Sequence, residues 1–187
     1  FSLPPLDRDE ARFAQATVQM LETGDFVSIR FQEDERNKKP AGIHWLQAAS
    51  VAAFSSVEAR EIWAYRLPSV LGAILAVVFT YAAAARLYGP GPALLAAIFL
   101  ASAPAVVGEA TIAKTDAMLL GMVAAALAAF VHVFSSVADR RKSSPLWPFV
   151  FWTAVGGGVL LKGPIILMIV GVAAAAMIAR RPKADWF

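Results

Sequence analysis

The stretch Leu67–Ala85 (LPSVLGAILAVVFTYAAAA) contains no charged residue and is about as long as the roughly 20 residues that a helix needs to cross a bilayer. Four further uncharged runs follow it. Hydrophobic residues make up 58% of the chain, which is a larger share than in typical soluble domains. The sequence therefore predicts an all-α membrane protein, with five transmembrane helices at about 66–88, 92–113, 116–138, 145–162 and 163–180.

Basic residues indicate how these helices are oriented. Arg86 follows the first predicted span, Arg140–Lys142 the third and Arg180–Lys183 the fifth, so these positions share one side. Cytoplasmic loops carry the excess of lysine and arginine, so this side is predicted to be the cytoplasm. Residues 1–65 and the hairpin at 162–164 then lie outside. The basic residues form no single patch, so the isoelectric point near 9.5 does not indicate a nucleic-acid partner.

The exterior segment 1–65 is predicted to be a loop with two helices along the membrane surface. Apolar residues recur at helical spacing from Phe13 onward, which predicts an amphipathic helix over 7–23. A second interfacial helix is expected over 41–54, with a polar loop and no sheet before it. An exported loop requires an earlier span, so we expect the chain to lack the first helix of a longer protein.

Four charged residues interrupt the apolar part on the predicted exterior side, namely Glu109, Lys114, Asp116 and Lys162. A charge at the bilayer centre costs on the order of 3 kcal/mol, so these residues are expected at the rim or facing a wet cavity. The plainer alternative is that they mark helix ends and reach toward water. His132 falls inside the third predicted span, where a hydrogen-bonded structural histidine is expected, and we assign it no function.

Motifs of soluble enzymes are absent from the sequence. It has no phosphate-binding glycine loop, no His-Glu-x-x-His pattern and no nucleophile elbow. It has no cysteine and two histidines, which disfavours a dedicated metal site, so no metal ligand is assigned. Carboxylates could hold a divalent cation, but nothing in the sequence indicates one, and no cofactor is predicted.

Several short segments of the chain carry a family resemblance. They are Asp9–Ala14 (DEARFA), Met20–Phe26 (MLETGDF), Lys39-Pro40 with Trp45, Arg66–Ser69 (RLPS), Asp116 and Leu161–Pro164 (LKGP). These segments closely resemble the bacterial membrane glycosyltransferases related to lipid A aminoarabinose transferase and the protein O-mannosyltransferases. The resemblance covers essentially the whole chain, and it implies a C-type glycosyltransferase fold whose remaining helices and C-terminal periplasmic domain are missing here.

The resemblance also implies an activity. It is an inverting sugar transfer from a polyprenyl-monophosphate donor to a lipid, protein or glycan acceptor, at the periplasmic face of a bacterial inner membrane. Asp9 matches the family's catalytic aspartate, with Glu10 as a supporting neighbour. Lys39 matches the lysine that binds the donor phosphate, a role that suits a compact cation. The residues Asp116, Lys162 and His44 are candidates for the cavity.

Two departures from the family pattern bear on this expectation. Lys38 stands where relatives commonly have glutamate, and the acidic run 33–35 replaces aromatic residues. Metal binding through that glutamate is therefore in doubt.

Two other classes of function remain as alternatives to a glycosyltransferase. A transporter or lipid flippase would place polar residues near the bilayer midplane, and a non-catalytic scaffold would use the exterior loop only to bind a partner.

Overall fold

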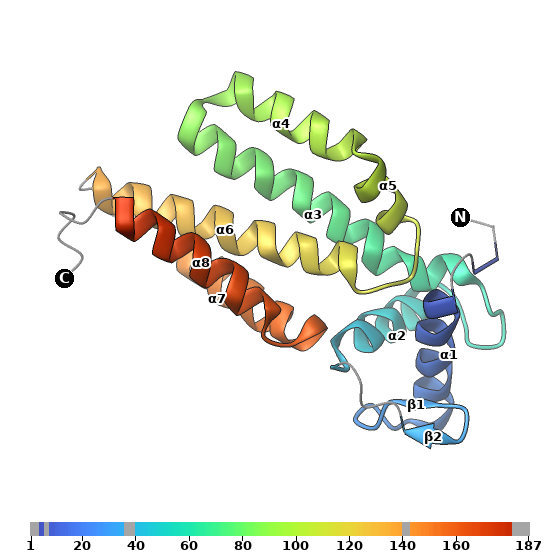
Figure 1. Cartoon of the computed structure of the whole chain (residues 1–187). Helices are drawn as coiled ribbons and strands as arrows, with labels where there is room; N and C mark the ends of the chain where they lie inside the picture. Colours follow the sequence, from blue (N-terminus) through green and yellow to red (C-terminus); the bar gives the residue numbers. More distant parts are fainter. Residues whose placement is uncertain (1–3, 6–7, 36–39, 140–142, 181–187) are drawn as a thin grey trace.

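The computed structural model describes residues 4–5, 8–35, 40–139 and 143–180 (Figure 1). Helices α1 and α2 lie together at one end of an elongated bundle, and we call this pair the platform. The elements are α1 (Arg8–Thr23), β1 (Arg30–Phe31), β2 (Asp34–Glu35), α2 (Gly42–Phe54), α3 (Ile62–Tyr88), α4 (Pro90–Ser102), α5 (Pro104–Ala110), α6 (Asp116–Ala138), α7 (Leu146–Lys162) and α8 (Ile165–Arg180).

The helices expected at the membrane surface are present with nearly the predicted bounds, since α1 and α2 correspond to 7–23 and 41–54. The absence of a sheet was a wrong prediction. Arg30 pairs with Glu35 and Phe31 with Asp34, which forms a small antiparallel hairpin. Gln32 makes the turn with φ +59°. Strands of two residues are too short to show the alternating pattern that predicts strands.

Within the described ranges, α3 and α6 are long and apolar enough to cross a membrane, and α4 with α5 can count as a third span. Helices α7 and α8 are apolar but shorter, with 17 and 16 residues. Five spans therefore stay a prediction. Large apolar side chains are exposed around the bundle, as expected for a membrane protein; they include Leu94, Phe99, Phe149, Trp152, Met168 and Val172.

The second predicted span, 92–113, is not one straight helix. It is divided into α4 and α5, which are bent by 60° relative to each other. The break is at Ala103, whose extended backbone precedes Pro104. A proline has no amide hydrogen and disfavours helical conformation in the residue before it, which explains the break. The α5 helix then ends at Ala110, and residues 111–115 form a link to α6.

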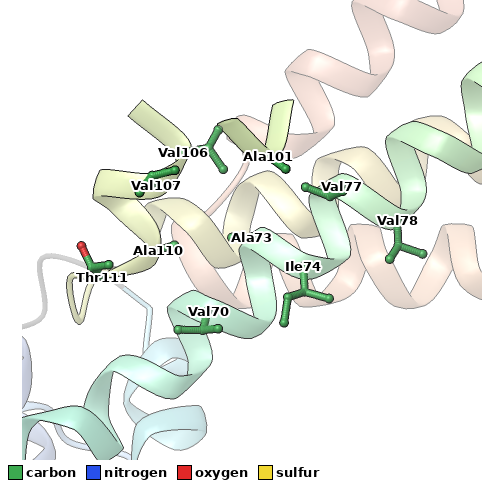
Figure 2. Close-up of a pocket in the computed structure, with 10 residues that line it drawn as sticks. All are labelled: Val70, Ala73, Ile74, Val77, Val78, Ala101, Val106, Val107, Ala110 and Thr111. Carbon is green, nitrogen blue, oxygen red and sulfur yellow. The ribbon is translucent and has the colours of Figure 1, made fainter. Parts of the chain in front are cut away.

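The bent pair leaves an apolar groove of about 410 Å³ along α3 (Figure 2). Figure 2 shows side chains of α3 on one wall and side chains of α4 and α5 on the other. Thr111 carries the one hydroxyl group among the lining residues. This groove therefore contributes no charged chemistry, and the polar groups of interest lie elsewhere. The lining residues are Val70, Ala73, Ile74, Val77, Val78, Ala101, Val106, Val107, Ala110 and Thr111.

Helices α3 and α6 meet backbone to backbone where glycines face each other. A Cβ atom on Gly72 would lie 2.3 Å from Met118 Cα, and one on Gly121 would lie 2.5 Å from the Gly72 carbonyl oxygen. Small residues allow such close approach between membrane helices. Ser69, one turn before Gly72, is also buried on this helix. The contact fixes the start of α6 closely against α3.

Apolar clusters join the platform to the bundle. One contains Phe13 of α1, Ile43 of α2, Met118 of α6 and Leu161 of α7. Another joins Val18 of α1 and Val51 of α2 to Ala64 and Tyr65 of α3. A Cβ atom on Gly42 would lie 2.5 Å from the Leu160 carbonyl oxygen, so the start of α2 rests directly on the end of α7. The platform is therefore packed against α3, α6 and α7 at the end where the polar residues gather.

Candidate active site

The two adjacent acids at the start of α1 have opposite environments. Successive helical side chains project about 100° apart. The Asp9 side chain is 47% exposed and lies 3.4 Å from Arg12 Nη1. The Glu10 side chain is fully buried. Glu10 lies three residues before the buried Phe13 and so belongs to the inward face of α1. Asp9 is therefore the acid that a substrate could reach.

Glu10 forms a buried ion pair with Arg66, in the second turn of α3. Arg66 Nε donates to Glu10 Oε1 at 2.8 Å, and Arg66 Nη2 donates to Oε2 at 3.2 Å. Arg66 Nη2 also lies 3.4 Å from the Pro4 carbonyl oxygen. A buried pair is tolerated only when the partners and further hydrogen bonds satisfy both charges. This bidentate contact ties α1 to α3 across 56 residues of sequence.

The link between α5 and α6 is attached to the same carboxylate. The backbone N–H of Ala113 donates to Glu10 Oε1 at 2.9 Å. On the other side of that residue, Gln47 Nε2 of α2 lies 3.4 Å from the Ala113 carbonyl oxygen. Ser69 Oγ of α3 donates to the Lys114 carbonyl at 3.1 Å. Side chains from three helices thus hold one irregular segment.

A second polar cluster connects α1 and α2. Thr17 Oγ1 lies 2.7 Å from Gln47 Oε1 and 2.9 Å from His44 Nδ1. The His44 ring also packs against Phe13, with 5.5 Å between the ring centroids. His44 is buried in the interior between these helices, so its predicted role as a cavity residue has no support from this position and stays a prediction.

Pro68 accounts for a further hydrogen bond between the platform and α3. As a proline it cannot donate to the carbonyl of Ala64, four residues earlier in the helix. Ser50 Oγ of α2 donates to that carbonyl at 2.6 Å. The carbonyl freed by the proline is therefore satisfied from the neighbouring helix, as a buried backbone group requires.

Asp116 and Lys162 form an ion pair at the same end of the bundle. Asp116 begins α6 and Lys162 ends α7, and both side chains are partly exposed. Asp116 also lines a small cavity of about 200 Å³ together with Glu109. The Glu109 Oε2 atom is buried and has no hydrogen-bond partner among the described residues. The structure thus brings the two predicted residues Asp116 and Lys162 together.

The segment Thr23–Ser28 forms a turn after α1 that is held by hydrogen bonds. Gly24 has φ +69°, a conformation that favours glycine. Asp25 Oδ1 accepts the backbone N–H groups of Val27 and Ser28, each at 3.0 Å. Both bonds lower the pKa of the Asp25 carboxyl, and the bond from Ser28 has the larger effect. The turn places the Phe26 carbonyl 2.7 Å from Trp45 Nε1, so the turn and α2 are joined.

These features make the platform end of the bundle the candidate active site. Comparisons with known proteins identify the family of the chain. The family model for dolichyl-phosphate-mannose-protein mannosyltransferase matches residues 38–187. The chain belongs to this family.

Named relatives of this mannosyltransferase-family chain include an undecaprenyl phosphate-α-4-amino-4-deoxy-L-arabinose arabinosyl transferase from Pseudomonas aeruginosa. It is 31% identical over 156 residues, which cover 83% of this chain and 27% of that protein. The corresponding transferase 1 of Sodalis glossinidius is 28% identical over 165 residues, which cover 88% of this chain and 29% of the relative. The chain thus spans somewhat over a quarter of the length of these relatives.

Solved structures of ArnT from Cupriavidus metallidurans share the fold of this mannosyltransferase-family chain. The apo structure superposes with a TM-score of 0.85 at 25% identity, over 99% of this chain and 33% of that one. The structure bound to undecaprenyl phosphate gives a TM-score of 0.83 at 25% identity, over 97% and 32%. The expected family and a mostly helical architecture of the ArnT kind are confirmed.

Lys39, the expected phosphate-binding residue of this family member, lies outside the described residues. Its neighbour Lys38, which departs from the family pattern, also lies outside them. Among the residues that are described, no group of three or more histidine or acidic side chains could hold a metal ion. Asp9, Asp116 and Lys162 are placed at one end of the bundle, and their roles stay predictions.

The sequence interpretation missed several residues that build this site. Arg66, Gln47, Thr17 and Ser69 carry its polar contacts, yet none was assigned a role. Arg66 had a usable signal, because a lone arginine at the entry to an apolar helix needs a partner. The other three are neutral and differ in no visible way from ordinary helix residues.

Proposed function

We propose that the full-length protein is an inverting glycosyltransferase. It moves a sugar from a polyprenyl-monophosphate donor to an acceptor on the periplasmic side of a bacterial inner membrane. The observation that carries the proposal is the exposed Asp9 carboxylate beside the buried Glu10–Arg66 pair, at the start of a helix fixed to the bundle. The names of the relatives, which include undecaprenyl phosphate-linked aminoarabinose, support a donor of this class.

In the proposed reaction the acceptor hydroxyl attacks the anomeric carbon as the bond to the donor phosphate breaks. Asp9 takes the proton of the acceptor and stabilises positive charge that develops on the sugar. Polyprenyl phosphate leaves with the bonding electrons. Lys39 would offset the charge of that phosphate, as a compact cation can. The product carries the opposite anomeric configuration because a single displacement occurs.

In this proposal Glu10, predicted to support the catalytic Asp9, does so by fixing position and not by contacting the substrate. Its carboxylate is fully buried and is occupied by Arg66 and by the Ala113 N–H group. It therefore acts as a positioning residue that holds α1, α3 and the link after α5. This contact fixes the backbone next to Asp9, one residue earlier. A catalytic base must be held in a defined position to react efficiently.

A transporter or flippase is less well supported. Such proteins place ionisable residues near the bilayer midplane. Here Asp116 and Lys162 lie at helix ends, and Glu10 and Arg66 lie at the contact between α1 and α3. His132, which does lie within α6, stacks on Trp147 at 3.8 Å between ring centroids and has Nε2 3.2 Å from the Ala82 carbonyl oxygen. These contacts are sufficient to explain it structurally.

The catalytic assignment is tested with Asp9→Asn in the full-length protein. Loss of a general base typically lowers turnover by about 10²–10⁴-fold, while binding of the donor lipid should be largely retained. Glu22→Gln is the matched control, because Glu22 is an exposed acid on the same helix, far from its start. Near-normal turnover of Asp9→Asn would return Asp9 to the role of a helix-start acid.

The proposed sidedness is tested by labelling introduced cysteines, since these 187 residues contain none. An impermeant thiol reagent added to intact spheroplasts should label Asp34→Cys in the exterior hairpin. It should not label Arg141→Cys, which lies in the predicted cytoplasmic link. Labelling at position 141 without labelling at position 34 would invert the orientation.

A further inference from the structure

The link 111–115 between α5 and α6 is not helical. Its backbone groups therefore lack the regular hydrogen bonds that a helix provides. Within the link, Lys114 N–H bonds to the Ile112 carbonyl at 2.9 Å, and the regular helix of α6 begins only at Asp116. Ala113 and Thr115 are nevertheless almost completely buried. Buried irregular backbone requires partners from elsewhere in the structure. Here those partners are the side chains of Glu10, Gln47 and Ser69.

Of the three contacts, the one from Ser69 reaches the link residue nearest in sequence to Asp116. The Ser69 hydroxyl donates to the Lys114 carbonyl at 3.1 Å, two residues before Asp116. Ser69 is fully buried, and it lies one helical turn before Gly72, whose backbone touches the start of α6 at Met118. The Ser69 hydroxyl and the glycine contact therefore bracket the first turn of α6 from the same face of α3.

We propose that Ser69 is a positioning residue for sugar transfer, which acts by holding the Lys114 carbonyl and so the start of α6 with the Asp116–Lys162 pair. This inference rests on the proposed function. Without the hydroxyl the partly buried Lys114 carbonyl loses a donor, and the link is held less firmly. A shift there moves Asp116 relative to Asp9, because Glu10 next to Asp9 holds the same link at Ala113. Small displacements in an active site have large effects on rate.

Ser50 provides a matched control. It is also a buried serine on a helix, and its hydroxyl also donates to a backbone carbonyl of another element, that of Ala64 at 2.6 Å. Ser50→Ala and Ser69→Ala thus remove the same group, and each leaves one backbone carbonyl with one donor fewer. The two variants differ in position, since Ala64 belongs to α3 and not to the link. A loss of activity in Ser69→Ala that is absent in Ser50→Ala can therefore be assigned to the contact with the link.

The experiment uses the full-length enzyme with a polyprenyl-phosphate-linked aminoarabinose donor and lipid A. For Ser69→Ala we expect kcat to fall about tenfold or more. We also expect a donor KM and a Tm close to those of Ser50→Ala. Ser69→Thr restores the hydroxyl and should recover part of kcat. By hydrogen exchange, residues 113–118 should lose protection in Ser69→Ala and keep it in Ser50→Ala.

Equal kcat values for Ser69→Ala and Ser50→Ala, with wild-type transfer intact, would overturn the positioning role and leave the proposed function standing. A fall in kcat that follows the loss of folded protein would overturn it as well, because the effect would then be structural. A wild-type enzyme that transfers no sugar from any polyprenyl-phosphate donor would overturn the proposed function, and this inference with it.

Discussion

The two ends of the helix bundle carry charged residues in different ways. At the platform end, the Glu10–Arg66 pair is buried, with side chains 0% and 2% exposed, and it joins α1, α3 and the link before α6. At the opposite end, Arg86 pairs with Asp139 in a partly exposed contact between the ends of α3 and α6. Charge at one end therefore joins three elements of the fold, whereas at the other end it forms a partly exposed contact between two helix ends.

The largest effect on stability is expected when one partner of the buried Glu10–Arg66 pair is removed. Arg66→Met leaves the Glu10 carboxylate without its main partner. Loss of one member of a buried pair typically costs about 3–5 kcal/mol of unfolding free energy. Denaturation of the purified full-length protein in detergent measures this loss. Glu10→Gln should be similarly destabilising, and the double variant should lose less than the sum, because the two residues interact directly.

An intermediate effect is expected at the Asp116–Lys162 pair, which is at the platform end but partly exposed. Asp116→Asn should change the unfolding free energy by less than about 1 kcal/mol, as for other exposed pairs. It should nevertheless lower sugar transfer about tenfold or more, equivalent to about 1.4 kcal/mol in the barrier. Lys162→Gln tests the partner. If both variants kept normal transfer, these residues would only mark helix ends.

A smaller effect is expected at the opposite end. Arg86→Gln removes one partner of an exposed pair, so the unfolding free energy should change by no more than about 1 kcal/mol and transfer should stay near normal. The same detergent denaturation and transfer assays measure both quantities. A loss as large as that of Arg66→Met would show that the two ends do not differ in the way described.

The smallest effect concerns the turn after α1 and its pH dependence. Hydrogen bonds from the Ser28 and Val27 amides hold the pKa of Asp25 below its ordinary value of 3.8. Because the folded pKa is the lower one, the stabilisation is complete above the ordinary pKa and is lost as pH falls through the lowered value. The indole N–H signal of Trp45 in NMR should therefore move only below about pH 4. Asp25→Ala should show the moved signal at neutral pH.

Helix locations were largely predictable because apolar runs, glycines and prolines define them. The predicted bounds of α1 and α2 lie within one residue of the observed ones. The division at Pro104 was missed, although a proline in the middle of a span is a known breaking signal. The small hairpin gave no pattern to detect.

The site was less predictable than the fold. That Glu10 faces inward could have been predicted, since it continues the stripe of Phe13, Thr17 and Met20 along α1. Its partner could not, because Arg66 is 56 residues away and only the packing of α1 on α3 brings the two together. The contacts of Ser69 and Gln47 with the link depend on an irregular backbone path that no periodic pattern encodes.

The glycine contact between α3 and α6 has a consequence for the environment in which the protein works. The atoms nearest to Gly72 and Gly121 are backbone atoms and the Leu75 Cβ, so shape holds the two helices at this contact. Salt, divalent cations and acid weaken exposed ion pairs, but they do not act on two touching backbones. The register of these helices is therefore expected to stay the same while ionic conditions outside the membrane vary. The charged pairs beyond that crossing can then respond to those conditions without the bundle sliding.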